Sequence, residues 1–118
     1  MIIAVVDDLM FSSKISTVAK AIKVDVVFVR SAEQVFLRIK EKRPSLIIFD
    51  LNSARLKPLE IITAIKTNAE LQSIRTLGYL SHVNVDLASA ARKAGADKVL
   101  ARSTFSEQLP NILSSPNH

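Results

Sequence analysis

The 118-residue chain has no cysteine and only two glycines. Without cysteine, the protein can form neither a disulfide framework nor a thiolate metal site, which fits a cytoplasmic location. Because glycine occurs only at Gly78 and Gly95, the chain lacks both the glycine-rich fingerprint of dinucleotide-binding folds and a phosphate-cradling P-loop. These absences argue against a nucleotide-binding or flavin-binding enzyme.

Long apolar segments are also missing. No apolar run approaches the ~20 residues that a helix needs to span a bilayer. The apolar run near the N-terminus, residues 2–6, is too short for the core of a signal peptide and has no basic residues before it. We therefore expect no membrane as a partner.

The chain is basic, with a formal charge of +5, but its 16 basic residues are scattered along the sequence. The densest cluster, residues 38–43, is interpreted as the solvated face and end of a helix, where cations also suit the helix dipole. The alternative is an anion-binding surface. Because the basic residues are scattered, nucleic acid is not an expected partner. Hydrophobic residues make up 48% and charged residues 23% of the chain, the balance of a soluble globular protein.

Short apolar runs alternate with helical patterns along the chain, which at this length predicts one domain over residues 1–118. A helix is expected after each strand. The first begins at about residue 12, and the second begins at Ser31, which has capping-box spacing to Gln34. Gly95 suits the left-handed position just past the end of a later helix. The expected strands are residues 2–6, 24–29, 46–49, 75–80 and 98–101.

This alternation predicts an α/β fold. Five strand–helix units give a parallel sheet with helices on both faces. The smallest doubly wound arrangement is a three-layer α/β/α sandwich whose five-stranded parallel sheet has the order 2-1-3-4-5. The last helix is expected to be short, late-starting or kinked, because Pro110 would remove a hydrogen bond in mid-helix.

Acidic residues follow two strands that are neighbours in this order. Asp7 and Asp8 follow the first strand and Asp50 follows the third, at the switch point where such sheets bind ligands. Three like charges in one cleft would repel each other, whereas Mg²⁺ binds carboxylate and carbonyl oxygens. The sequence therefore predicts a magnesium site. The alternative is that these acids cap helices or face water.

Two further polar residues follow strands at the same edge. Ser81 follows the fourth strand and Arg102 the fifth. A hydroxyl and a cation facing a carboxylate–metal cleft suit phosphoryl transfer, and a carboxylate can act as the nucleophile and form an acyl phosphate. His82 is interpreted as a residue of the rim. A phosphatase of the Asp-x-Asp type is poorly supported, because Asn52 occupies its second acidic position.

Several segments together resemble the receiver domain of two-component response regulators, a flavodoxin-like fold, over essentially the whole chain. These segments are VVDD, IIFDLN, LEIITAIK, YLS and KAGADKVLAR. The resemblance implies that Asp50 accepts a phosphoryl group from a histidine kinase or a histidine phosphotransfer protein. It implies that Asp8, Asp50 and the backbone carbonyl of Asn52 bind Mg²⁺, with Asp7 acting mainly through water. Ser81 would hydrogen-bond the phosphoryl group.

The same resemblance implies a stand-alone phosphorelay protein in the cytoplasm. No output domain is expected after the receiver, so signalling would depend on binding a downstream target protein. A homodimer is left open. No independent enzymatic activity is expected beyond phosphorylation and dephosphorylation of the chain's own aspartate.

The sequence departs from the family pattern in four ways. Arg102 with Ser103 stands in place of lysine with proline, and Val99 stands in place of the aromatic switch residue. Ala54 replaces a proline, and Lys57 with Pro58 replaces an acidic–glycine pair. Arginine can still pair with a phosphoryl oxygen, but the exchange is not conservative. These departures keep open an alternative, a phosphorylation-independent pseudo-receiver that acts as a docking or dimerisation module.

Overall fold

The computed structural model describes residues 1–81 and 84–114, so His82, the predicted rim residue, lies outside the described part. The strands are β1 (Ile2–Val5), β2 (Val26–Val29), β3 (Leu46–Asp50), β4 (Arg75–Leu80) and β5 (Lys98–Ala101). The helices are α1 (Leu9–Ile22), α2 (Ala32–Glu41), α3 (Pro58–Lys66), α4 (Val85–Ala94) and α5 (Arg102–Ser114), with a 3₁₀ turn, η1 (Ala54–Leu56). None of the helices in these ranges has the length and apolar character needed to cross a bilayer.

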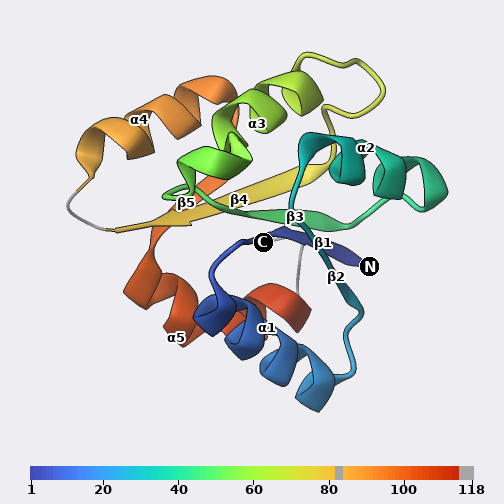
Figure 1. The fold of residues 1–118 in the computed structure, drawn as a ribbon, viewed down its shortest axis with the longest axis vertical. Coiled ribbons are helices and arrows are strands. Elements are labelled where there is room, and N and C mark those ends of the chain that lie inside the picture. The colour runs from blue at the N-terminus through green and yellow to red at the C-terminus, as the bar shows by residue number, and fades with distance from the viewer. Residues whose placement is uncertain (82–83, 115–118) are drawn as a thin grey trace.

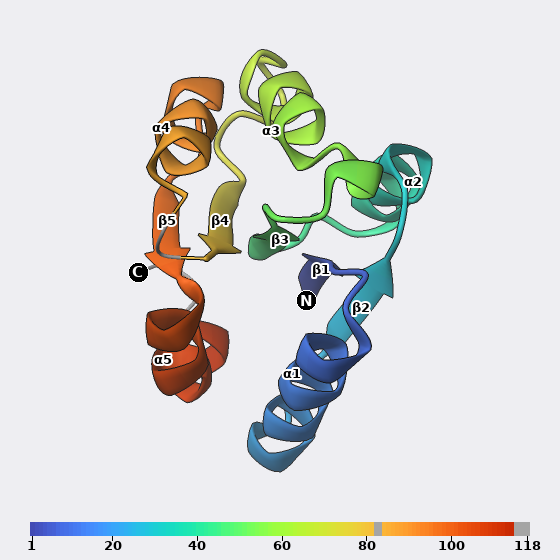
Figure 2. The same cartoon turned by 60° about the vertical axis from the view of Figure 1, so that its left-hand side comes forward.

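The five strands form one parallel sheet in the order β2-β1-β3-β4-β5, as predicted. Figure 2 shows the sheet between two layers of helices, with β5 and β2 at its edges. Strands β1 and β3 lie side by side with Val5 opposite Phe49. The carboxyl ends of these two strands, which carry the predicted site, are therefore adjacent.

The two layers of helices bury two separate cores. Helices α2, α3 and α4 cover one face of the sheet, and α1 and α5 cover the other (Figure 1). The central strands β1 and β3 are buried along their whole length, which explains why their sequences are continuous apolar runs rather than alternating ones.

Local sequence signals account for most helix ends. Helix α1 begins at Leu9, earlier than predicted, because Asp8 caps it: Asp8 Oδ1 accepts hydrogen bonds from the backbone N–H groups of Met10 and Phe11. The Ser31 side chain caps α2 by accepting from the Gln34 backbone N–H at 3.1 Å, as predicted. Gly95 ends α4 with φ 112°, also as predicted.

The last helix, α5, is neither short nor late-starting, so those expectations were wrong. It begins at Arg102, directly after β5, and continues through Pro110 to Ser114. A mid-helix proline costs about 3 kcal/mol, whereas each fully buried large apolar side chain contributes about 1.5–3 kcal/mol. Four α5 side chains are buried on the sheet and outweigh the proline: Phe105, Leu109, Ile112 and Leu113.

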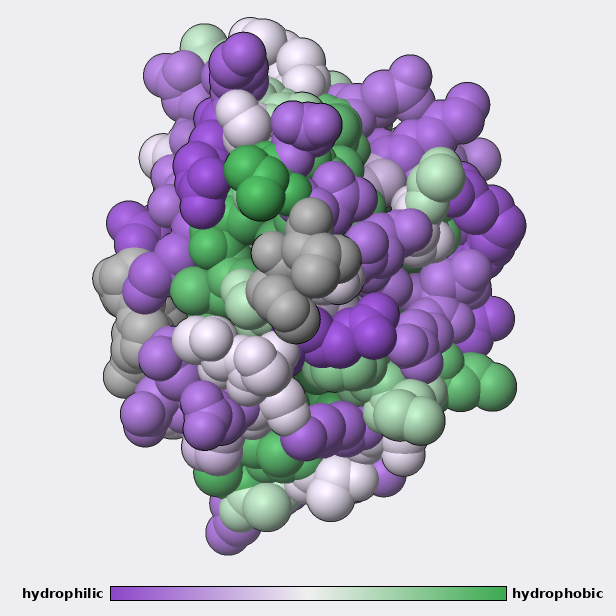
Figure 3. Space-filling view, turned by 90° about the vertical axis from the view of Figure 1, so that its left-hand side faces the viewer, coloured by the Kyte–Doolittle hydropathy of each residue, from purple (hydrophilic) through white to green (hydrophobic). Residues whose placement is uncertain are grey.

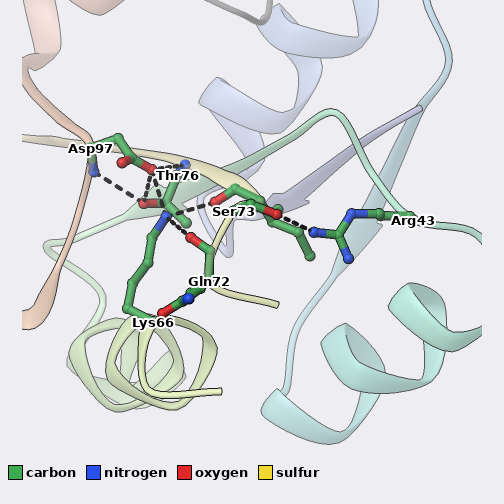
Figure 4. Close-up of polar contacts among 7 residues, drawn as sticks. Arg43, Lys66, Gln72, Ser73, Thr76 and Asp97 are labelled. Carbon is green, nitrogen blue, oxygen red and sulfur yellow. Dashed lines mark hydrogen bonds and ion pairs between the residues drawn. The ribbon is translucent and has the colours of Figure 1, made fainter. Parts of the chain in front are cut away.

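A partly buried ion pair joins three elements at the amino ends of β4 and β5, the edge opposite the predicted site (Figure 4). Lys66 Nζ, at the end of α3, lies 2.7 Å from Asp97 Oδ2 and donates to the carbonyls of Gln72 and Ile74 at 3.1 and 2.7 Å. Asp97 Oδ2 also accepts from the backbone N–H and the hydroxyl of Thr76. This network fixes the end of α3 against the start of β4 and the loop before β5.

Candidate functional site

Asp50 is the centre of the candidate site. It is the last residue of β3, is only 5% exposed, and is the one buried acidic residue in the described ranges. Its Oδ1 accepts a hydrogen bond from the backbone N–H of Asn52 at 3.0 Å. Burial raises the pKa of the Asp50 carboxyl, the Asn52 hydrogen bond and the charge of Arg102 oppose this rise, and the negative charges of Asp8 and Asp7 add to it. The predicted charged residues therefore act on one another at this edge of the sheet.

Asp8 lies on the loop between β1 and α1. Its Oδ1 accepts from the Met10 N–H at 2.8 Å and from the Phe11 N–H at 3.4 Å. One oxygen of this carboxylate is thus used to cap α1, which is the role that the alternative interpretation of the sequence gave to these acids.

Asp7 is held by two arginines from neighbouring loops. Arg55, in η1, forms a two-point contact with it: Nη2 lies 2.6 Å from Oδ1, and Nε donates to Oδ2 at 3.0 Å. Arg30, directly after β2, lies 3.9 Å from Oδ1 through its Nε. The hydrogen bond from Arg55 lowers the pKa of Asp7, and the charges of Arg55 and Arg30 lower it further against a smaller opposing effect of burial.

These contacts decide how well the three acids suit a metal ion. Within residues 1–81 and 84–114, no three acidic or histidine side chains gather closely enough to hold a metal. The oxygen donors of Asp8, Asp50 and the Asn52 carbonyl are of the type that Mg²⁺ prefers. The negative charges of Asp8 and Asp7 raise the pKa of Asp50, and a bound dication would lower that pKa again. Asp7 is instead paired with Arg55. The assignment of Asp7, Asp8, Asp50 and Asn52 as metal ligands stays a prediction.

Asn52 links the end of β3 to the end of β4. Its backbone N–H contacts Asp50, while its side-chain Oδ1 accepts from the backbone N–H of Ser81 at 2.9 Å. The structure therefore places the backbone of Ser81 within hydrogen-bond distance of the Asn52 side chain, and the part of Ser81 in phosphoryl binding stays a prediction. Two hydrogen bonds through Asn52 thus connect Asp50 with Ser81.

Arg102 lies at the site but faces an aromatic ring. Its guanidinium carbon is 5.1 Å from the centre of the Phe11 ring, within cation–π range. The positive charge of Arg102 nevertheless reaches Asp50, because it opposes part of the rise in the Asp50 pKa that burial causes. Phe11 continues into an aromatic stack, because its ring centre is 5.1 Å from that of Tyr79, which lies 4.5 Å from that of Phe105. This stack positions Arg102 beside the site.

A groove of about 480 Å³ adjoins Asn52. It is lined by Leu51, Asn52, Ala54, Lys57, Pro58, Leu59, Glu60, Asn84 and Leu87. Figure 3 views the molecule from the side toward which β4 points in Figure 1, where hydrophobic residues gather in a band among hydrophilic ones. The amino-terminal end of α4 lies on this side, and its first residue, Val85, is 73% exposed. This side of the molecule combines polar site residues with apolar surface.

Sequence reasoning missed several residues of the site. Arg55 and Arg30 gave no motif, although the position of Arg30 directly after a predicted strand placed it at the correct edge of the sheet. Phe11 and Tyr79 were missed because their contact with each other and with Arg102 depends on how α1 packs. The contacts of the four residues could be found only from the three-dimensional structure.

Comparison with known proteins gives a clear result for the fold. No family model matches the sequence, and no curated protein matches it. The structure is similar to a response regulator from Hahella chejuensis, with 20% identity, 99% of this chain and 96% of the other covered, and a TM-score of 0.84. It is also similar to the phosphorylated cyanobacterial phytochrome response regulator RcpA (21% identity, 98% and 89% covered, TM-score 0.79) and to the Mn²⁺-bound response regulator Rcp1 (21% identity, 97% and 91% covered, TM-score 0.77). These likenesses establish the flavodoxin-like receiver fold that the resemblance predicted.

Proposed function

We propose that this chain is a receiver domain that accepts a phosphoryl group on Asp50 in the presence of Mg²⁺. The observation that carries the proposal is the position of Asp50: it is buried at the carboxyl end of a central strand and interacts electrostatically with Asp7, Asp8 and Arg102. The likeness to a phosphorylated response regulator supports it. The phosphoryl donor would be a histidine kinase or a histidine phosphotransfer protein.

The proposed reaction transfers one phosphoryl group from a phosphohistidine. A carboxylate oxygen of Asp50 attacks the phosphorus, and the P–N bond breaks with its electron pair staying on the imidazole nitrogen, which takes up a proton. The product on this chain is an aspartyl phosphate. Hydrolysis by water then restores the Asp50 carboxylate and releases inorganic phosphate, so no separate enzymatic activity is needed.

The residues of this chain have distinct parts in that transfer. The Asn52 N–H holds Asp50 Oδ1 at 3.0 Å, so Oδ2 is the proposed nucleophile. Asp8, Asp50 and the Asn52 carbonyl would bind Mg²⁺, and a bound Mg²⁺ supplies charge neutralisation for the incoming phosphoryl oxygens. The likeness to a Mn²⁺-bound response regulator supports a divalent cation here. Arg102 and the Ser81 hydroxyl would contact the phosphoryl oxygens.

The proposed output is a change in the surface around Ser81. Asn52 links Asp50 to Ser81 through two hydrogen bonds, and phosphorylation adds charge and acceptor oxygens beside them. The backbone at Ser81 would shift between two arrangements. A downstream target protein or a second copy of this chain would bind one of them. A cytoplasmic location belongs to the same proposal.

A second candidate function is supported by the contacts of the acids. Asp7 is paired with Arg55, Asp8 caps α1, and Arg102 lies over Phe11. These contacts occupy the carboxylates of Asp7 and Asp8 and the guanidinium of Arg102 with partners from the chain itself. They favour the phosphorylation-independent pseudo-receiver, in which the same fold acts as a docking or dimerisation module.

Beryllofluoride with Mg²⁺ separates the two functions, because it mimics the phosphoryl group on an aspartate. Backbone NMR spectra are recorded with and without 10-fold excess of the reagent, for the natural chain and for Asp50→Asn. The receiver proposal expects shifts centred on Asp50, Asn52 and Ser81 in the natural chain and none in the variant. Natural-chain spectra that stay unchanged at saturating Mg²⁺ would favour the pseudo-receiver. Acetyl phosphate gives an independent check through a mass increase of one phosphoryl group.

A further inference from the structure

Arg55 is placed to compete with a metal ion. It lies in η1, in the loop between β3 and α3, and its side chain reaches Asp7 in the loop between β1 and α1. Both contacts with Asp7 have hydrogen-bond length, 2.6 and 3.0 Å, and they use both carboxylate oxygens. This is the two-point geometry in which guanidinium–carboxylate pairs are most specific.

The pair also changes the charge that a metal ion meets. Asp7 is one of the two acids whose negative charge raises the pKa of Asp50, so it contributes to the field at the candidate metal site. Arg55 and Arg30 place two positive charges against that carboxylate. A dication that approaches Asp8 and Asp50 must therefore compete with Arg55 for Asp7, whether Asp7 acts directly or through water.

We infer that Arg55 is a tethered cation that holds Asp7 when no metal is bound and thereby lowers the affinity of the Asp50 site for divalent cations. The inference rests on the proposed function only in taking the Asp50 site as a divalent-cation site. When a divalent cation binds, the Arg55 guanidinium would leave the Asp7 carboxylate. Arg55 thus acts as a specificity-determining residue, because it sets the concentration of divalent cation at which the site is half occupied.

Calorimetric titration with Mn²⁺ alone tests this inference. The Mn²⁺ affinity of the natural chain is compared with that of Arg55→Ala and that of Lys57→Gln. Lys57→Gln is a matched control, because it removes one positive charge from the same loop. We expect Arg55→Ala to bind Mn²⁺ roughly two- to five-fold more tightly than Lys57→Gln, the range that the loss of an exposed ion pair gives. In an Asp7→Asn background the additional gain from Arg55→Ala should disappear.

The arginine side chain gives a second measurement that does not depend on affinity. The Arg55 Nε–Hε signal is followed by NMR during titration with diamagnetic Mg²⁺. We expect its exchange with water to quicken as Mg²⁺ binds, because the hydrogen bond from Nε to Asp7 Oδ2 is lost. The corresponding signal of Arg43, which lies in another part of the molecule, should stay unchanged.

Each outcome has a defined meaning. Equal Mn²⁺ affinities for Arg55→Ala and Lys57→Gln, or no binding by either, would overturn the inference. Binding by Arg55→Ala but not by the natural chain would support it. In that case a natural chain that also fails to respond to beryllofluoride would refute the proposed phosphoacceptor function while the inference stands. A natural chain that responds while Arg55→Ala and Lys57→Gln bind alike would refute the inference alone.

Discussion

Lys66 Nζ lies 2.7 Å from Asp97 Oδ2, and the same nitrogen donates to two backbone carbonyls, those of Gln72 and Ile74. An ammonium group has three donors, so all three are satisfied. The Lys66 side chain is only 14% exposed. Its charge is compensated by contacts that join α3, the start of β4 and the loop before β5, at the edge opposite Asp50.

Replacing Lys66 with methionine should therefore destabilise the fold without affecting the candidate site. The variant leaves the Asp97 carboxylate and two backbone carbonyls without their donor, and we expect a loss of about 2 kcal/mol in the free energy of unfolding. Urea denaturation followed by circular dichroism measures it. Lys20→Met, at an exposed position in α1, is the control and should change stability by less than about 0.5 kcal/mol. Equal effects of the two variants would show that the network contributes little.

The same network predicts a loss of stability in acid. Burial alone would raise the pKa of Asp97, but the hydrogen bonds from Lys66 and Thr76 and the charge of Lys66 outweigh it, so the pKa is lowered from 3.8. A carboxyl whose pKa is lower in the folded state stabilises the fold above its unfolded pKa. This contribution is lost as the pH falls below 3.8 and through the folded value.

Unfolding free energies of the natural chain and of Asp97→Asn, measured between pH 2 and pH 6, check this prediction. The advantage of the natural chain should be full above about pH 5 and should shrink as the pH falls toward 2. The exposed Asp25, replaced by asparagine, provides the reference. A difference between the natural chain and Asp97→Asn that stays constant with pH would contradict the lowered pKa.

The hydroxyl of Tyr79 is buried without a hydrogen-bond partner among the described residues, although the ring itself stacks on Phe11 and Phe105. An unsatisfied buried polar group costs about 1–3 kcal/mol. Tyr79→Phe keeps the stack and removes this cost, so we expect the free energy of unfolding to rise by about 1 kcal/mol. Chemical denaturation measures the change.

A second variant separates the ring of Tyr79 from its hydroxyl. Tyr79→Leu removes the aromatic contacts and should destabilise the fold by at least about 1 kcal/mol, since stacked pairs contribute about 0.5–1.5 kcal/mol each beyond their buried area. If Tyr79→Phe instead destabilised the protein, the hydroxyl would have a partner that stabilises it.

The fold was predictable because it depends on local patterns. The buried runs of β1 and β3, the Ser31 cap and Gly95 each determine a short segment. The alternation of strands and helices along the chain then predicts the doubly wound strand order. The length of α5 was mispredicted because a local penalty at Pro110 was weighed without the tertiary burial of Phe105 and its neighbours.

The site was predictable only in part, for a different physical reason. The strand order makes the ends of β1 and β3 neighbours, and these ends carry Asp7, Asp8 and Asp50. That order could be predicted from the alternation of apolar runs and helical patterns. Which cation contacts each acid is decided by side chains from separate loops, as Arg55 shows. Such contacts leave no spacing in the sequence.

Because Asp50 is buried, we predict that its ionised carboxylate lowers the free energy of unfolding. Its pKa is raised by burial first and by the charges of Asp8 and Asp7, against the opposing effects of the Asn52 N–H and of Arg102. A carboxyl whose pKa is higher in the folded state favours folding while protonated. As the pH rises above 3.8 and through the folded value, that stabilisation is lost, so at neutral pH the ionised carboxylate is unfavourable.

Asp50→Asn should therefore raise the stability at pH 7, on the order of 1 kcal/mol, because the amide oxygen can still accept from the Asn52 N–H. The gain should vanish below about pH 3, where the natural carboxyl is protonated as well. Adding Mg²⁺ should narrow the difference at pH 7, since a bound dication stabilises the natural chain alone. A variant that is less stable than the natural chain at pH 7 without Mg²⁺ would mean that Arg102 and Asn52 outweigh burial at Asp50.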